Sequence, residues 1–110
     1  MTVEKLSELC SFDVCTMPEP DKEIKGAYIG DLLSWVMGRA TEGNVWITIM
    51  SNVNTIAVAS LADVSCILIS ERVTVDDELL KTAKAKGVNV LSSKVASYET
   101  ALDVARVING

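Results

Sequence analysis

Short apolar runs alternate with amphipathic stretches along most of this chain of 110 residues. The runs that have the length and the aliphatic composition of buried strands are 24–29, 45–50, 66–70 and 88–91. The stretches in which apolar residues recur at helical spacing are 32–40, 55–62, 77–86 and 98–108. This alternation predicts an α/β fold, with an open, mostly parallel sheet and helices on both of its faces.

The first 23 residues predict a short helix and a strand ahead of this alternation. Val3, Leu6 and Leu9 lie close to one face of a helix, and Thr2 is placed to cap it. A short strand is expected at 12–15. Two prolines among acidic residues then indicate a loop rather than a domain boundary, because too little chain precedes them to fold alone. We therefore expect a single domain over residues 1–110.

Capping residues predict where several helices begin and end. Asp31 can cap the helix that follows it, and Ser51 or Asn52 can cap the next one. Gly43 and Gly87 are suited to end helices with a positive φ. The apolar stripe of the last helix consists of Tyr98, Ala101, Leu102, Ala105 and Ile108.

The stretch at 55–62 is apolar almost all the way round and contains small residues. Such a helix must be covered on more than one side. In a short chain the second cover is either another helix or a partner subunit, and we favour a homodimer.

The net charge of −5 and a pI near 4.6 argue against nucleic-acid and anionic-membrane partners, because the ten basic residues are scattered. No apolar stretch is long enough for a signal peptide or a bilayer span, so a cytoplasmic protein is expected.

The three cysteines lack a C-x-x-C pair, and the chain has no histidine. The sequence therefore predicts no metal and no other cofactor; cluster handling by Cys10, Cys15 and Cys66 would need an oligomer.

Three polar segments directly follow predicted strands. They are Ser51-Asn52-Val53-Asn54, Ser70-Glu71-Arg72 and Ser92-Ser93-Lys94. Ligands of open parallel sheets bind outside the carboxyl ends of the strands, so these segments could bind a nucleotide or another anion. The candidate ligand-binding residues are Ser51, Asn52, Asn54, Ser70, Arg72, Ser92, Ser93 and Lys94. Helix caps and turns select the same residue types, which leaves a purely structural role open for each.

Catalytic motifs are missing from the sequence. It contains no phosphate loop, no G-x-G-x-x-G, no nucleophile elbow and no histidine for proton transfer near neutral pH. The acidic cluster Asp76-Asp77-Glu78 stands at a helix start, where its charge favours the helix dipole. We expect a protein that is not an enzyme.

The segments "IKGAYIGDLLSWVMGRATEGNVWITIMSNVNTIAVASLADVSCILIS" and "GVNVLSSKVASYETALDVARVI" resemble the DRTGG domain. This family is similar in fold to the N-terminal domain of HPr kinase/phosphorylase. The resemblance implies a regulatory module that tends to dimerise, and short stand-alone versions are expected near iron-only hydrogenase genes. The chain departs from the family motif at 51–53 and 70–72, so ligand contacts carry over as positions only.

Two functional hypotheses follow. The first is a non-catalytic regulatory or protein-interaction module, homodimeric and connected with iron-only hydrogenase metabolism or assembly, with a protein partner there. The alternative is a sensor that binds a nucleotide or anion at the carboxyl edge of the sheet.

Overall fold

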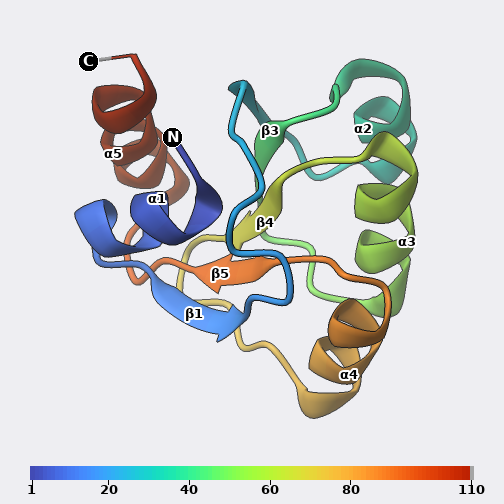
Figure 1. The fold of residues 1–110 in the computed structure, drawn as a ribbon. Helices are drawn as coiled ribbons and strands as arrows, with labels where there is room; N and C mark the ends of the chain where they lie inside the picture. The colour runs from blue at the N-terminus through green and yellow to red at the C-terminus, as the bar shows by residue number, and fades with distance from the viewer. Residues whose placement is uncertain (110) are drawn as a thin grey trace.

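The computed structural model describes residues 1–109, which form five helices and five strands (Figure 1). The helices are α1 (Val3–Cys10), α2 (Leu33–Arg39), α3 (Val53–Ala62), α4 (Asp77–Ala85) and α5 (Ser97–Ile108). The strands are β1 (Asp13–Thr16), β2 (Gly26–Ile29), β3 (Asn44–Thr48), β4 (Cys66–Ile69) and β5 (Val90–Ser92). Among these residues, no helix has the length and hydropathy that a bilayer crossing requires.

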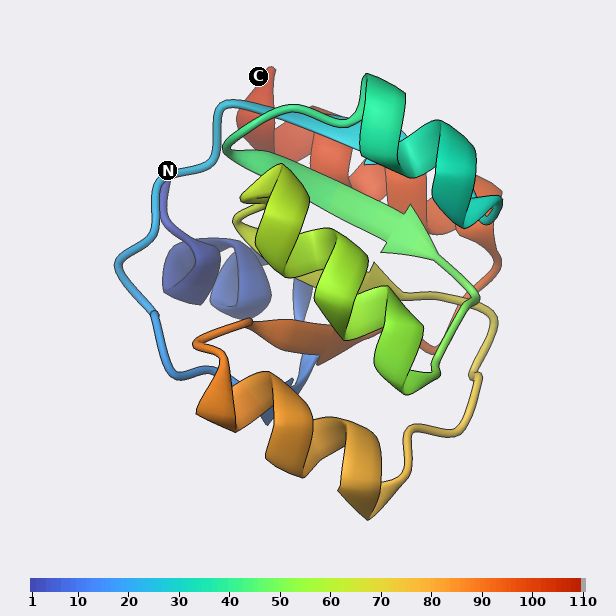
Figure 2. The same cartoon turned by 90° about the vertical axis from the view of Figure 1, so that its right-hand side faces the viewer.

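The five strands form one sheet in the order β1-β5-β4-β3-β2. Strands β2 to β5 are parallel, and β1 is antiparallel to β5. From β2 to β5 each connection moves the chain one strand along the sheet, with α2, α3 and α4 on one face (Figure 2). The helices α1 and α5 lie on the opposite face (Figure 1). The predicted α/β fold, mostly parallel and covered on both faces, is confirmed.

The interior strands β3 and β4 are buried at every position. Trp46, Ile67 and Ile69 point into the apolar layer under α2, α3 and α4. On the other face, Ile47 and Leu68 belong to the layer under α1 and α5. Aliphatic side chains on alternate faces thus build two separate cores, as expected of a parallel sheet.

Helix α3 packs on the sheet between α2 and α4 (Figure 2). Its Ile56, Val58 and Ala59 are buried, whereas Leu61 is 74% exposed. Neighbouring helices of the same chain therefore cover one side of this apolar helix, and that side requires no partner subunit. Its outer side retains the exposed residues Val53, Ala57 and Leu61.

Asp31 does not cap α2, contrary to the prediction from the sequence. The helix begins at Leu33, and its N-cap residue, Leu32, makes no side-chain capping bond. The Oδ1 of Asp31 instead accepts hydrogen bonds from Thr48 Oγ1 (2.8 Å) and from the N–H of Ile49 (3.0 Å). These bonds divert the chain from the β3 ladder, which explains why β3 ends at Thr48 and not at residue 50.

The apolar stripe predicted for the last helix is only partly covered. Thr100 and Val104 are the buried residues of α5. Tyr98 is 70% exposed and Leu102 is 44% exposed. The helix is therefore rotated relative to its apolar stripe, and part of that stripe faces outward.

The three cysteines do not converge. Cys66 and Cys10 belong to the layer under α1 and α5, whereas Cys15 packs against the other layer. Among residues 1–109, no three side chains of the types that bind metals gather as a ligand set. Complete burial raises the pKa of the Cys66 thiol to about 12, and burial also raises the pKa values of Cys10 and Cys15.

Replacing Asp31 tests its structural role. Asp31→Ala removes the acceptor for Thr48, whose side chain is buried, so the free energy of unfolding should fall by about 1.5–3 kcal/mol. Asp31→Ser retains a capping oxygen but cannot reach Thr48, and should cost about as much. Urea denaturation measures both, with Asp76→Ser, which retains the cap of α4, as the nearly neutral control. A stable Asp31→Ser variant would contradict this role.

Because the Cys66 thiol is buried and its pKa is raised, the protein should lose stability at alkaline pH. In the unfolded chain the thiol ionises near its ordinary pKa of 9.0, whereas in the folded protein it stays neutral up to about 12. The neutral Cys66 thiol therefore makes its full contribution to the free energy of unfolding below pH 9. As pH rises from 9 to 12 the free energy of unfolding falls by up to about 1.4 kcal/mol per pH unit. Cys66→Ala should show a shallower decline in urea titrations, and Cys10→Ala, at a less buried site, a smaller change. Equal slopes for wild type and Cys66→Ala would refute the assignment.

Candidate functional site

The loops after β2, β3, β4 and β5 share one edge of the sheet, because these strands are parallel. The chain leaves β4 toward α4 on one face and leaves β5 toward α5 on the opposite face. Such a divergence is the place where open α/β sheets form a ligand crevice. The geometry between the ends of β4 and β5 therefore decides whether the predicted site can accept a ligand.

Direct hydrogen bonds join the two loops at this point. The N–H of Glu71 donates to Val95 O (2.9 Å), and the hydroxyls of Ser70 and Ser97 lie 2.7 Å apart. Arg72 donates from its Nε to Lys94 O at 3.0 Å. Ser70 is fully buried. The two loops are thus joined by hydrogen bonds that engage the Ser70 hydroxyl, the Glu71 N–H and the Arg72 Nε.

The carboxylate of Glu71 lies at the N-terminus of α5. Its Oε2 accepts a hydrogen bond from the N–H of Ser97 at 2.7 Å. The N-cap residue of α5, Ala96, has no side chain that could do this. A helix N-terminus attracts anions through its free N–H groups and its dipole. Glu71 therefore occupies the position that an anionic ligand would take at α5.

Glu71 and Arg72 both have left-handed backbones, with φ of 63° and 56°. This conformation is unfavourable for residues with a Cβ, by roughly 1–2 kcal/mol each. The bonds from Glu71 and Arg72 to the loop after β5 hold the turn in place. The hydrogen bonds between the two loops therefore account for the unfavourable backbone conformations of Glu71 and Arg72.

The residues predicted after β5 are also engaged. Ser92 is the last residue of β5, and the buried hydroxyl of Ser93 lies 2.8 Å from that of Thr100. Lys94 extends toward β1, where its Nζ is 3.8 Å from Asp13 Oδ2, with both side chains more than half exposed. Such an exposed pair contributes little to stability. Arg72 thus contacts the backbone of Lys94, while the ammonium group of Lys94 lies near Asp13.

The segment before α3 is separate from the joined loops. Asn52 is the N-cap residue, and its Oδ1 accepts from the N–H groups of Asn54 (2.9 Å) and Thr55 (3.3 Å). Ser51 is half-buried and Asn54 is exposed. The hydroxyl of Thr55, which is fully buried, has no hydrogen-bond partner. Of the two predicted caps, Asn52 is therefore the one that the helix uses.

Sequence reasoning missed Asp31, Glu71 and Ser97 as residues that organise this edge. Asp31 directly follows an apolar strand, which is the signal that identified the other three segments. Glu71 lay within a predicted segment but was not among the candidate ligand-binding residues. The pairing of Glu71 with Ser97, 26 residues apart, has no local sequence signal.

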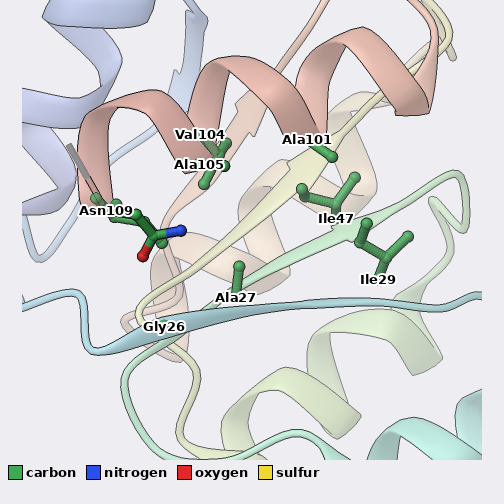
Figure 3. A pocket seen from close by; sticks show the side chains of 9 residues that line it. Gly26, Ala27, Ile29, Ile47, Ala101, Val104, Ala105 and Asn109 are labelled. Carbon is green, nitrogen blue, oxygen red and sulfur yellow. The ribbon is translucent and has the colours of Figure 1, made fainter.

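An apolar groove lies elsewhere, between β2 and α5 (Figure 3). Ala27, Ile29 and Ile47 point from the sheet toward α5, which contributes Ala101 and Ala105 (Figure 3). The groove has a volume of about 310 Å³. The residues of the predicted α5 stripe that line it are Ala101, Ala105 and Ile108, whereas the exposed Tyr98 and Leu102 lie outside the groove.

Further apolar side chains are exposed on β2 and α2. Ile29 is 54% exposed, Leu32 is 59% exposed and Trp35 is 53% exposed. The guanidinium of Arg39 lies over the Trp35 ring, 3.8 Å from its centroid. The β2 end of the sheet thus has a group of exposed apolar side chains; others lie elsewhere, such as Leu61 on α3 and Val95 in the loop after β5.

Comparison with known proteins identifies a family and one related fold. The DRTGG domain matches residues 19–107. No curated protein matches the chain in sequence. Among solved structures, the chain is similar to the CBS and DRTGG domains of the regulatory region of Clostridium perfringens pyrophosphatase, complexed with the activator diadenosine tetraphosphate. The TM-score is 0.73 at 15% identity, over 94% of this chain and 45% of that chain.

The chain spans less than half of that pyrophosphatase structure, and their low identity shows a shared fold alone. The family match shows more, because it is a match in sequence that covers most of the chain and includes β2 to β5 with the helices between them. The chain therefore belongs to the DRTGG domain family.

Proposed function

We propose that this DRTGG domain, over residues 1–110, is a non-catalytic regulatory or protein-interaction module that works as a homodimer. The observation that carries the proposal is the contrast between two surfaces. At the carboxyl edge of the sheet, the polar groups of the loops after β4 and β5 bind one another. At the β2 end, Ile29, Leu32 and Trp35 are exposed.

Exposed apolar surface is unfavourable in water and favours contact with another protein. Each Å² of apolar surface that is buried contributes about 25 cal/mol. Contiguous apolar patches on a monomer typically mark interaction sites. The side chains of β2, α2 and the groove along α5 therefore support an interaction module better than they support a free monomer.

A regulatory role also agrees with the related fold. The Clostridium perfringens structure belongs to the regulatory region of its enzyme. In the present chain, the carboxylates of Glu71, Asp31 and Asp76 accept backbone hydrogen bonds. A carboxylate engaged in this way holds a loop or a helix end and is poorly placed for proton transfer. These roles support a module without chemistry of its own.

We further propose that the protein partner belongs to iron-only hydrogenase metabolism or assembly. This part rests on the resemblance to short stand-alone DRTGG domains alone, as does the similarity to the HPr kinase/phosphorylase N-terminal domain. Its test is complex formation between the purified chain and purified hydrogenase-assembly proteins. No co-migration on a sizing column would count against it.

A second candidate function is a nucleotide or anion sensor. The observation that favours it is the start of α3, where Ser51, Asn52 and Asn54 remain outside the joined loops and the buried Thr55 hydroxyl has no partner. The related structure was solved in complex with a nucleotide activator. Asn52 caps α3 with a neutral amide, whereas Glu71 places a negative charge at the start of α5, so α3 is the helix start that repels an anion less.

Light scattering with a ligand panel separates the two functions. The interaction module should have twice the monomer mass of 11.8 kDa, whatever ligand is added. A sensor should show a raised melting temperature with one compound among adenine nucleotides, cyclic dinucleotides and acyl phosphates, since binding to the native state stabilises it. A monomer at millimolar concentration would refute the homodimer.

Glu71→Ala tests whether Glu71 is a structural cap. The variant leaves the N–H of Ser97 without its acceptor, so the free energy of unfolding should fall by about 1 kcal/mol. Glu71→Gln retains an acceptor oxygen and should lose less. Urea denaturation measures both, with Glu99→Ala, an exposed residue of the same helix, as the control. Unchanged stability in Glu71→Ala would show that the carboxylate is free for another role.

A further inference from the structure

The two edges of the sheet differ in how well they are protected against pairing with another chain. The outer strand β1 has an irregular register between Val14 and Thr16 and begins with the charged Asp13. Bulges and charges on an edge strand discourage such pairing. The outer strand β2, Gly26–Ile29, keeps a regular register with β3 at all its positions. It contains no charge and no proline.

The backbone of β2 presents two residues to the open side. The N–H of Gly30 donates to Ile47 O of β3 at 3.2 Å. Peptide groups alternate in direction along a parallel ladder, so Tyr28 also points its N–H and C=O toward β3. The N–H and C=O groups of Ala27 and Ile29 therefore face away from the sheet. The side chains of these two residues lie in the groove beside α5 (Figure 3).

A second copy of the chain fits this edge in one register. Two β2 strands related by a two-fold axis run antiparallel, and pairing about Tyr28 sets Ala27 opposite the partner's Ile29. The same register sets Lys25, which also pairs with Glu42 of its own chain, opposite the partner's Asp31, so that opposite charges flank the paired strands. Pairing about Ala27 would instead set Glu23 opposite the partner's Asp31. Pairing about Ile29 would set Ala27 opposite the partner's Asp31. Charge therefore selects the register about Tyr28.

The groove favours the same register. Ala27 is small and lines the groove on the side of the sheet, where Figure 3 shows it facing Ala105 of α5. Directly opposed side chains in an antiparallel pair lie about 5 Å apart at Cβ. The partner's Ile29 would then lie beside Ala27, where an apolar side chain fills the groove. Because the axis is two-fold, each copy fills the groove of the other.

We propose that two copies of this chain pair through β2, antiparallel about Tyr28, with each Ile29 filling the partner's groove along α5. The inference rests on the proposed homodimer and specifies its interface. The sheet then continues across both copies, and the unprotected edge of β2 is covered.

Substitutions at the two edges test the interface by light scattering and sedimentation velocity. Ile29→Lys places a charge in the groove and should raise the dissociation constant of the dimer by tenfold or more, on the order of 1.4 kcal/mol. Ala27→Pro removes an outward N–H at a position where an edge strand tolerates proline, and should have a similar effect. Val14→Lys on β1 and Leu61→Lys on α3 are matched controls at exposed apolar residues and should leave the mass unchanged. Circular dichroism verifies that each variant is folded.

Single cysteines test the register. In a chain that carries Cys10→Ser and Cys15→Ser, Ala27→Cys and Ile29→Cys are made separately and oxidised alone or mixed. Only the mixture should form a disulfide-linked dimer in high yield, because residue 27 opposes residue 29 of the partner at a distance that a disulfide can span. Efficient crosslinking of either variant alone would overturn the register.

The outcomes separate this inference from the proposed function. A wild-type monomer would overturn both the homodimer and the interface. A wild-type dimer that persists in Ile29→Lys and Ala27→Pro would leave the homodimer standing and overturn the β2 interface. Loss of the dimer in Val14→Lys, with Ile29→Lys unaffected, would assign the interface to β1 instead.

Discussion

The burial of β3 and β4 on both faces is the constraint on which the rest of the structure depends. Strands that are buried at every position cannot face water on either side. The chain meets this requirement by placing α2, α3 and α4 on one face and α1 and α5 on the other. This requirement also sets the direction of the chain after β5, because α5 must cover the face of the sheet that α2, α3 and α4 leave open. The loops after β4 and β5 diverge for the same reason.

Periodicity in the sequence was enough to predict the order and type of the elements. Strand runs such as 66–70 and helices such as 77–86 have clear local patterns, and the capping residues Thr2, Asn52 and Asp76 mark true helix starts. Asp31 shows where this reasoning fails. Its side chain had two possible partners, its own helix or the end of β3 that lies 17 residues further along the chain. Only the three-dimensional neighbourhood decides between them.

The positions of the polar segments in the fold could be predicted from the sequence, whereas the contacts of their side chains could not. The polar segments do follow parallel strands and do lie at one edge, as their positions in the sequence indicated. Whether their groups are free depends on contacts between loops that are 22 to 27 residues apart, such as Arg72 with Lys94 and Ser70 with Ser97. No local pattern encodes such pairs. The exposed stripe of α5 shows the same limitation, because the rotation of a helix about its axis is set by packing.

The bond between Glu71 and Ser97 links two regions that otherwise have separate roles. Ser97 begins α5, and further along the same helix Ala101 and Ala105 form a wall of the groove. Because a helix moves largely as a rigid rod, a displacement of α5 along its axis must also pull Ser97 away from the Glu71 carboxylate. The width of the groove and the integrity of the turn after β4 are thus mechanically connected through a single helix.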